Sequence, residues 1–227
     1  MNVKYAVRPM ELGDIPQVGE IDKESFPTMW PPVAYKRELT QNRLARYIVA
    51  DEVGAEVMPD TEAIPSTGNN GARSGLAGLV SGLKTLFGGK ADRVAEPPSP
   101  RQKLVGLAGL WFMVDEAHLT TIAVRGSYRR QGIGELLLIS AIDLSLERQC
   151  RFVTLEVRVS NKGAQAFYEK YGLARTGMRK GYYTDNHEDA LIMSTDAISS
   201  DQYQALFRRL KEDYSRKHGG VPSAQPR

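Results

Sequence analysis

In the middle of the chain a run of apolar residues ends at a basic, glycine-bearing turn, and this junction restricts the possible folds more than any other feature. Leu119–Val124 is typical of a β-strand, Gly126–Gly132 is typical of a turn, and the apolar pattern that begins at Ile133 predicts a helix. A strand, a tight turn and a helix start direct several backbone N–H groups at one point, with the positive end of the helix dipole behind them. Such a point binds phosphate, and Arg129 and Arg130 add positive charge for the same anion.

Three kinds of glycine-containing loop have related spacings. A P-loop requires Lys followed by Ser or Thr after its last glycine, where this chain has Glu135 and Leu136. A dinucleotide-binding loop requires a third glycine at position 137, which is leucine here. What remains is the pattern Arg129-x-x-Gly132-x-Gly134, for which the simpler alternative is an ordinary strand-to-helix turn.

Composition sets further bounds. The 227 residues are enough for one domain of ordinary size, and a formal net charge of +3 is too small to predict direct nucleic-acid binding. The single cysteine, Cys150, excludes an internal disulfide framework, suits a reducing compartment, and is expected to be a small buried side chain at a helix end. No stretch approaches the roughly 20 apolar residues of a membrane span. We therefore expect a cytoplasmic monomer.

Alternating and helical patterns predict the element order β-α-α-β-β-β-α-β-α-β-β. The predicted strands cover residues 5–9, 46–50, 103–114, 118–124, 152–159, 174–183 and 190–193, and the predicted helices cover 11–26, 33–42, 132–149, 162–171 and 201–218. Ser160 and Asn161 form the predicted N-cap of the fourth helix, and Gly172 ends it. Phe26–Pro32 must be a rigid loop, whose aromatic residues either floor a substrate groove or staple the next helix.

Residues 54–102 interrupt this pattern with linker-like composition and few core-forming residues. We interpret them as a low-complexity insertion into a hairpin. Within them an amphipathic period runs from Leu76 to Phe87; it either docks on a partner or a membrane surface, or covers its own domain. The predicted domain is residues 1–198 with this interruption, followed at 199–227 by a charged helix and a disordered tail.

Three blocks between residues 119 and 194 resemble the GNAT superfamily of acetyl-CoA-dependent N-acetyltransferases, and within it the RimI-type ribosomal-protein-alanine N-acetyltransferases. The glycine turn matches the superfamily's pyrophosphate signature, Leu155–Gly172 resembles LEVR-x-SN-x-x-A-x-x-x-Y-x-x-x-G, and Arg179–Met193 resembles R-x-x-YY…EDA-x-x-M. The N-terminal third matches only loosely, and Gly126 and Leu173 stand where the family has proline and phenylalanine. The resemblance implies an α+β fold with a central, mostly antiparallel twisted sheet flanked by helices.

The resemblance also implies how acetyl-CoA, the acetyl donor, would be held. The pantetheine arm would contact Ile122, Ala123, Val124 and Asn161, and the pyrophosphate would contact the amides of Arg130, Gln131, Gly132, Ile133, Gly134 and Glu135. Arg129 and Lys162 either meet the outer phosphates or are solvated. His118, His187 and His218 show no metal-ligand spacing, so we assign no metal.

Two residues are candidates for acid–base chemistry. Glu156 interrupts an apolar strand, so we expect a partly desolvated carboxylate with a raised pKa. Alternation alone favours a solvated carboxylate paired with Arg158, whereas the resemblance places the family's general base at Glu156. Tyr168 is a core aromatic by pattern and the proton donor to the leaving thiolate by resemblance.

The resemblance places Tyr182, Tyr183, Glu188 and Asp189 in the wall of the acceptor slot, where acidic groups suit a cationic N-terminus; the alternative is a hairpin loop of turn residues. We therefore expect an enzyme that acetylates the N-terminal alanine of a small-subunit ribosomal protein. The alternatives are other protein N-termini, a small amine, or a CoA-binding module without turnover. The presence of both Glu156 and Tyr168 argues against the last of these.

Overall fold

The computed structural model describes residues 4–27, 31–57 and 101–220, without the side chains of 56, 57 and 101. The chain divides into two units, Met1–Ala55 with Gln102–Arg227 and Glu56–Arg101, and the fold is that of the first unit. The predicted amphipathic segment 76–87 and the predicted disordered end beyond residue 220 lie outside the described residues.

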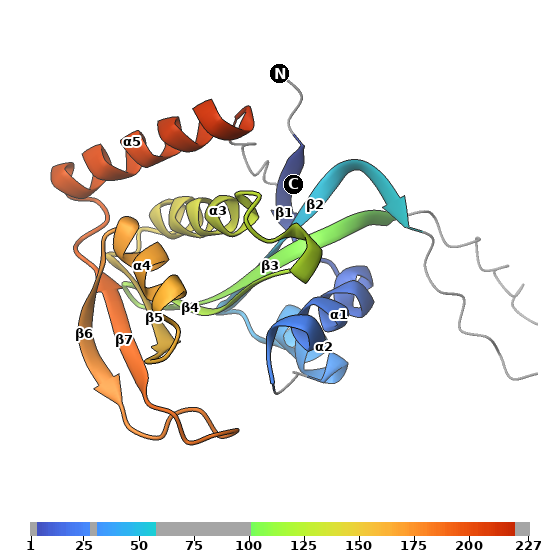
Figure 1. Cartoon of the computed structure of the whole chain (residues 1–227), viewed down its shortest axis with the longest axis horizontal. Coiled ribbons are helices and arrows are strands. Elements are labelled where there is room, and N and C mark those ends of the chain that lie inside the picture. The colour runs from blue at the N-terminus through green and yellow to red at the C-terminus, as the bar shows by residue number, and fades with distance from the viewer. Residues whose placement is uncertain (1–3, 28–30, 58–100, 221–227) are drawn as a thin grey trace, which may run out of the picture. The chain divides into compact units, whose positions relative to one another are not determined.

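A seven-stranded sheet in the order β1-β2-β3-β4-β5-β7-β6 forms the centre of the described part of the chain (Figure 1). Its strands are β1 (Tyr5–Pro9), β2 (Ala45–Val57), β3 (Arg101–Met113), β4 (Glu116–Val124), β5 (Phe152–Arg158), β6 (Leu173–Arg179) and β7 (Ala190–Thr195). β4 and β5 are parallel, whereas β1 with β2, β3 with β4, β5 with β7, and β6 with β7 are antiparallel. The predicted fold class, a mostly antiparallel mixed sheet with flanking helices, is confirmed.

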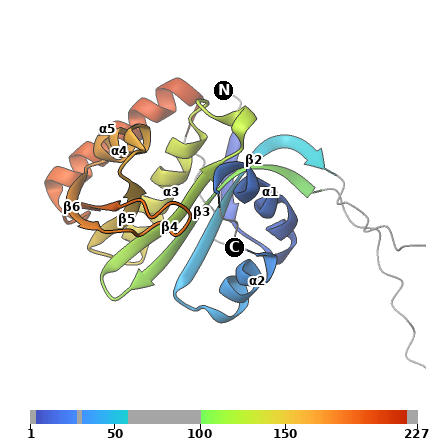
Figure 2. The ribbon, with the colours of Figure 1, turned by 60° about the horizontal axis from the view of Figure 1, so that its bottom comes forward.

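Helices cover both faces of this sheet (Figures 1 and 2). They are α1 (Ile15–Ser25), α2 (Pro32–Gln41), α3 (Ile133–Glu147), α4 (Lys162–Lys170) and α5 (Asp201–His218), with short 3-10 turns η1 (Leu12–Asp14) and η2 (Gly126–Tyr128). None of the helices in the described ranges has the length and apolar character needed to cross a membrane.

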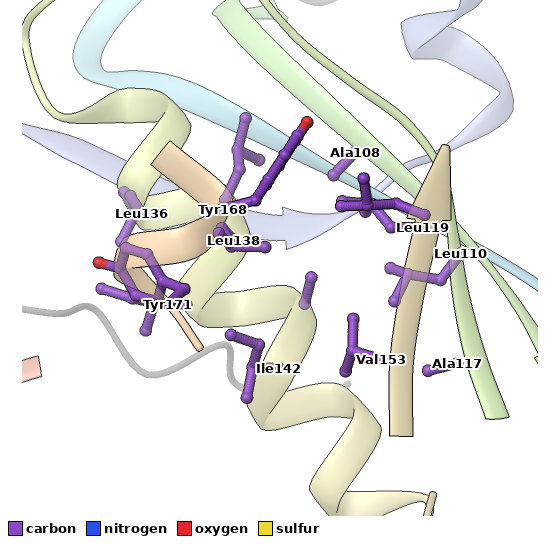
Figure 3. Packing of buried hydrophobic residues seen from close by; sticks show 14 of the residues in the cluster. Ala108, Leu110, Ala117, Leu119, Leu136, Leu138, Ile142, Val153, Tyr168 and Tyr171 are labelled. Carbon is purple, nitrogen blue, oxygen red and sulfur yellow. The ribbon is translucent and has the colours of Figure 1, made fainter. Parts of the chain in front are cut away.

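Strand alternation separates two hydrophobic cores, one on each face of the sheet. In β2, Tyr47 and Val49 belong to the core with α1 and α2, whereas Ile48 and Ala50 belong to the core with α3, α4 and α5. Figure 3 shows the second core, where side chains of α3 meet those of β4 and β5.

α3 is enclosed on nearly all sides, whereas its sequence pattern predicts a single buried stripe. Every residue from Leu136 to Ile142 is buried. The cause is α5, which lies over α3 in Figure 1 and adds Phe207 and Tyr214 to the same core. Lys211 Nζ also contacts both carboxylate oxygens of Asp143, at 2.8 and 2.9 Å.

The boundaries differ from the sequence-based prediction in two places that border the site and the insertion. β6 ends at Arg179 instead of residue 183, because Gly181 takes a positive φ of 57° that turns the chain out of the strand. Tyr182 and Tyr183 therefore lie in the loop between β6 and β7. β2 continues to Val57 and β3 begins at Arg101, so both strands include residues of the predicted 54–102 insertion.

Candidate active site

The site begins where β4 and β5 separate. The two parallel strands are paired only from Glu116 to His118 and from Phe152 to Thr154, and beyond these residues they diverge. A β-bulge in β4 lies beside this gap. Gly109 of β3 pairs with Thr121 and Leu110 with Leu119, so Thr120 is the extra residue of β4. Its Oγ1 donates a hydrogen bond to the Gly109 carbonyl at 3.1 Å. A bulge and an unpaired strand end leave room for a cleft in the middle of the sheet.

A pocket of about 720 Å³ opens there, bordered by β4, β5, α4, the end of α1 and the loop between β6 and β7. It brings together six of the residues predicted for the site: Ile122, Glu156, Asn161, Tyr168, Tyr182 and Tyr183. The other predicted residues do not line it: Ala123, Val124, Arg129, Arg130, Gln131, Gly132, Ile133, Gly134, Glu135, Glu188 and Asp189. Phe26 and Pro27 also line the pocket, which favours the groove interpretation for this end of their loop; residues 28–30 lie outside the described part.

Glu156 projects from β5 into a strongly cationic environment. Its side chain is only 7% exposed; Oε2 lies 2.9 Å from His118 Nε2, and Oε1 lies 2.9 Å from Arg179 Nε. The hydrogen bond from His118 is the largest influence and lowers the pKa of Glu156 below its ordinary value, against burial, which raises it, and with further help from Arg179. The prediction of a raised pKa is therefore wrong, because burial was considered without the two cationic partners.

His118 is the residue that sequence reasoning missed. Its Nδ1 lies 3.0 Å from Thr154 Oγ1, which in turn donates a hydrogen bond to Glu116. The hydrogen bond to Glu156 is the main cause of a raised His118 pKa, with burial opposing it. The sequence offers one signal, a histidine in a strand rich in apolar residues, but its neighbour Glu156 belongs to a strand far along the chain.

Arg158 is not the partner of Glu156, although alternation suggested it. Its guanidinium binds Asp185 at 2.8 Å and Glu188 at 3.2 Å instead. The side chain of Glu188 also accepts a hydrogen bond from the Ser160 amide at 2.7 Å, which is the main cause of lowering its pKa to about 2. Asp189 accepts a hydrogen bond from the Gly181 amide at 2.8 Å. The acidic groups predicted to contact the acceptor are thus engaged within the protein, Glu188 by Arg158 and Ser160, and Asp189 by Gly181.

Tyr168 in the last turn of α4 and Tyr171, directly after that helix, have different environments. Tyr171 donates a hydrogen bond to Glu135 at 2.8 Å, whereas Tyr168 lines the pocket with 7% of its surface exposed. Figure 3 shows their hydroxyl groups pointing away from each other. Burial raises the pKa of Tyr168, so this phenol keeps its proton at neutral pH and remains a hydrogen-bond donor.

Asn161 caps the same helix, as predicted, because its Oδ1 accepts a hydrogen bond from the Ala164 amide at 3.1 Å. It also lines the pocket near the start of α4. The local pattern of a cap residue before an amphipathic helix was sufficient to place it.

The glycine turn has the backbone geometry of an anion site. Arg130 and Gly132 both take positive φ angles, 64° and 85°, and the Leu136 amide makes the first helical hydrogen bond, to the Gly132 carbonyl at 2.9 Å. The amides between these positions therefore precede the helical ladder and fit a phosphate group. Side chains of the turn and of the first turn of α3 are engaged within the fold: Arg129 donates to the Val124 carbonyl at 3.3 Å, Tyr5 donates to Gln131 at 2.6 Å, and Glu135 accepts from Tyr171.

Among the residues that the structure describes, no group of three His, Cys, Asp or Glu side chains could hold a metal ion. The absence of a catalytic metal stays a prediction.

Comparisons with known proteins agree with this geometry. Residues 96–173 match the Acetyltransferase (GNAT) family. A protein of Bacillus subtilis (strain 168), named provisionally as a ribosomal protein bS18-alanine N-acetyltransferase, is 35% identical over 193 residues, which are 85% of this chain and 96% of that protein. An N-alpha-acetyltransferase of Saccharolobus solfataricus is 40% identical over 84% of this chain and 92% of its own length.

A solved structure shares the fold. The crystal structure of the ribosomal-protein-S18-alanine N-acetyltransferase from Escherichia coli aligns with a TM-score of 0.60 and 24% identity, covering 87% of this chain and 97% of that one. Together with the sequence identity to the Bacillus protein over almost its whole length, these findings establish the family. The chain belongs to the GNAT family of acetyltransferases and is an N-acetyltransferase.

Proposed function

We propose that this protein transfers the acetyl group of acetyl-CoA to the α-amine of an N-terminal alanine on a small-subunit ribosomal protein. The observation that carries the proposal is the ionised Glu156 in the pocket, held by His118 and Arg179 and facing the gap between β4 and β5. The acceptor's identity is supported by the names of the Bacillus and Escherichia relatives.

The lowered pKa of Glu156 favours an α-amine acceptor over a lysine side chain. A carboxylate with a low pKa is a weak base. An α-amine, with a pKa of about 7.7–8.0, needs little help to lose its proton at neutral pH, whereas lysine, at about 10.4, needs much more. Glu156 also lies between His118 and Arg179, and the positive charge of the Arg179 guanidinium disfavours an ammonium beside it and favours the neutral amine that can attack.

Acetyl-CoA would extend from the glycine turn before α3 to the gap between β4 and β5. The amides of Gly132, Ile133 and Gly134 suit the pyrophosphate, and the β4 edge that leaves its pairing with β5 after His118 offers backbone groups to the pantetheine arm. Asn161 borders the same path from the start of α4. This arrangement would bring the thioester to Glu156 and Tyr168.

The reaction then needs three actions from the chain. Glu156 accepts the amine proton, directly or through water, as the nitrogen attacks the thioester carbon. A backbone N–H of Ile122, Ala123 or Val124 stabilises the carbonyl oxygen. As the carbon–sulfur bond breaks, the Tyr168 hydroxyl donates its proton to the leaving sulfur, and solvent restores that proton.

A second candidate function is acetylation of other protein N-termini, which the name of the Saccharolobus relative favours. Peptides of ribosomal and unrelated sequence, each with a free and a blocked N-terminus, separate the two. Acetylation of the ribosomal alanine peptide at least about tenfold faster than of the others supports the leading proposal. Equal rates on all free N-termini support the second candidate, and modification of an internal lysine or a small amine alone contradicts both. A monomer in the cytoplasm without contacts to nucleic acid stays a prediction.

A further inference from the structure

The loop between β6 and β7 forms the acceptor side of the pocket, yet it lies outside the regular sheet (Figure 1). Tyr182, Tyr183, Thr184 and Asp185 of this loop line the pocket. Tyr182 is 44% exposed, so a solvent-facing ring forms part of this wall. A wall of this kind binds a substrate well only if something fixes its conformation before the substrate arrives.

A single side chain makes most of the fixing contacts. The Arg158 guanidinium lies over the Tyr183 ring, 3.8 Å from its centroid. One of its terminal nitrogens donates to Asp185 at 2.8 Å, and the other lies 3.0 Å from Asn186 Oδ1 and 3.2 Å from Glu188 Oε2. A planar guanidinium can stack on a ring and bridge carboxylates simultaneously, which the ammonium of a lysine cannot do.

Arg158 is itself firmly held. It is the last residue of β5, two positions after Glu156, and its backbone pairs with Ala190 of β7. Its carbonyl accepts a hydrogen bond at 2.9 Å from Gln165 of α4, a side chain that is only 1% exposed. The arginine therefore connects the loop to the same rigid strand that carries the candidate base.

These contacts also determine the charge of the wall. Asp185 and Glu188 share the guanidinium, and Asp189 is bound to Gly181 and Lys180. Each of these three carboxylates is therefore bound to groups of the protein itself, so we expect this wall to select its acceptor mainly by shape.

We infer that Arg158 is a positioning residue for the acceptor, which orders the loop 181–189 so that Tyr182 and Tyr183 form a preshaped wall beside Glu156. This inference rests on the proposed function, because it assumes that the acceptor enters along this wall. Arg158 itself borders the pocket, but its guanidinium is engaged by Asp185, Asn186 and Glu188, so we assign it a role in ordering the loop rather than in the chemical step.

The test is a comparison of Arg158→Met with Arg158→Lys and Arg148→Met. Arg148 is a matched control, because its guanidinium also lies over a ring, that of Phe112 at 4.9 Å, but it is far from the loop in the fold. For Arg158→Met we expect the KM for an N-terminal peptide to rise about tenfold, since the cost of ordering the loop moves to the binding step. We expect kcat to stay within about threefold and the KM for acetyl-CoA to be unchanged. Arg158→Lys should recover only part of the peptide KM, and Arg148→Met should match the wild type.

Hydrogen–deuterium exchange of residues 181–189 gives a second measurement that does not depend on activity. Faster exchange in this segment for Arg158→Met, but not for Arg148→Met, supports the inference. Asp185→Asn removes the charge from one of these contacts without changing β5 and should shift the exchange and the peptide KM in the same direction by a smaller factor.

The inference is overturned if Arg158→Met leaves both the peptide KM and the exchange of residues 181–189 unchanged. It is also overturned if this variant lowers kcat, raises both KM values by similar factors and melts at a lower temperature, because the substitution then disturbs the whole fold. If the wild-type enzyme acetylates no peptide N-terminus, the proposed function fails. The exchange experiment then still decides whether Arg158 orders the loop.

Discussion

Glu156 and His118 are joined by a 2.9 Å contact between Oε2 and Nε2, at the point where β4 and β5 separate. The pKa of the carboxyl group is lowered and that of the imidazole is raised, chiefly by this hydrogen bond. The carboxylate therefore stays ionised to a lower pH, and the imidazole stays protonated to a higher pH, than each group would without its partner. The proposed base is therefore an ionised group that His118 and Arg179 already hold in one orientation.

Glu156→Gln should reduce kcat about 10²–10⁴-fold, which is the usual contribution of general acid–base catalysis. The amide is similar in size to the carboxylate but cannot accept the amine proton, so acetyl-CoA affinity, measured by calorimetry, should be unchanged. Glu169→Gln is the control, because Glu169 is an exposed α4 residue paired with Arg175. Full turnover of Glu156→Gln would exclude the proposed base.

His118→Ala should shift the acid limb of the kcat/KM profile to higher pH. His118 is the main cause of the low Glu156 pKa, and without it the burial of the carboxylate, which raises the pKa, has less opposition. The base of the variant is then protonated at a pH where the wild-type base is still ionised. The profile is measured from about pH 4 to 9, and an acid limb that coincides with that of the wild type would refute this account of the pair.

The same pair makes stability depend on pH. The folded-state pKa of His118 is raised, so its contribution is fully present below its unfolded value of about 6.5 and is lost as the pH rises through the folded value. The folded-state pKa of Glu156 is lowered, so its contribution is present above its unfolded value of about 4.3 and is lost as the pH falls through the folded value. Urea unfolding should therefore show the largest difference between the wild type and His118→Ala near pH 5.5, and a smaller difference at about pH 9.

Tyr168→Phe should lower kcat by about 10²-fold if the hydroxyl protonates the leaving sulfur. Tyr171→Phe is the matched control, because it removes a hydroxyl that binds Glu135 and that points away from the pocket hydroxyl. The control should lose about 1 kcal/mol of unfolding free energy and keep its kcat. Wild-type kcat in Tyr168→Phe would reduce Tyr168 to an aromatic residue of the core.

Gly109→Ala should destabilise the protein by about 1–3 kcal/mol, because a Cβ at this position would lie 2.4 Å from the Tyr47 ring. Tyr47 lines the pocket, so the displaced ring should also alter acceptor binding. In Gly19→Ala, within α1, the new Cβ meets nothing within 4 Å, and we expect a gain of about 0.5–1 kcal/mol. Chemical denaturation of the two variants measures both effects, and a neutral Gly109→Ala would contradict the close packing.

Replacement of residues 58–100 by a short Gly/Ser turn should leave kcat and both KM values unchanged. β2 and β3 are neighbours in the sheet, so a short connection can join them. A shorter loop also costs less closure entropy, and the free energy of unfolding should rise by about 2 kcal/mol at most. Loss of activity or of cellular localisation in this variant would instead indicate that the segment binds a partner.

Local features of the site could be predicted from the sequence. The turn before α3 and the Asn161 cap depend on residues that are adjacent in the chain, and Gly172 takes the predicted left-handed conformation at the end of α4. The buried environment of Cys150 after a helix was predicted from the same kind of pattern.

Features that depend on contacts between distant segments could not be predicted. The sign of the Glu156 pKa shift is set by His118 and Arg179, which arrive from β4 and from the end of β6. The sequence does not show that acidic residues of the β6–β7 loop bind Arg158, because this contact joins segments that are far apart in the chain. The coverage of α3 by α5 is of the same kind, because helical spacing does not show which surface a later helix will cover.

The enclosure of α3 also has a consequence for how such an enzyme can diversify. The proposed phosphate turn is attached to a helix surrounded by protein on both sides, so substitutions in that helix disturb the whole interior. The proposed acceptor wall is attached near the margin of the sheet, and its residues can change without repacking that interior. On the proposed function, new acceptor preferences are therefore accessible to mutation while the donor half stays constant.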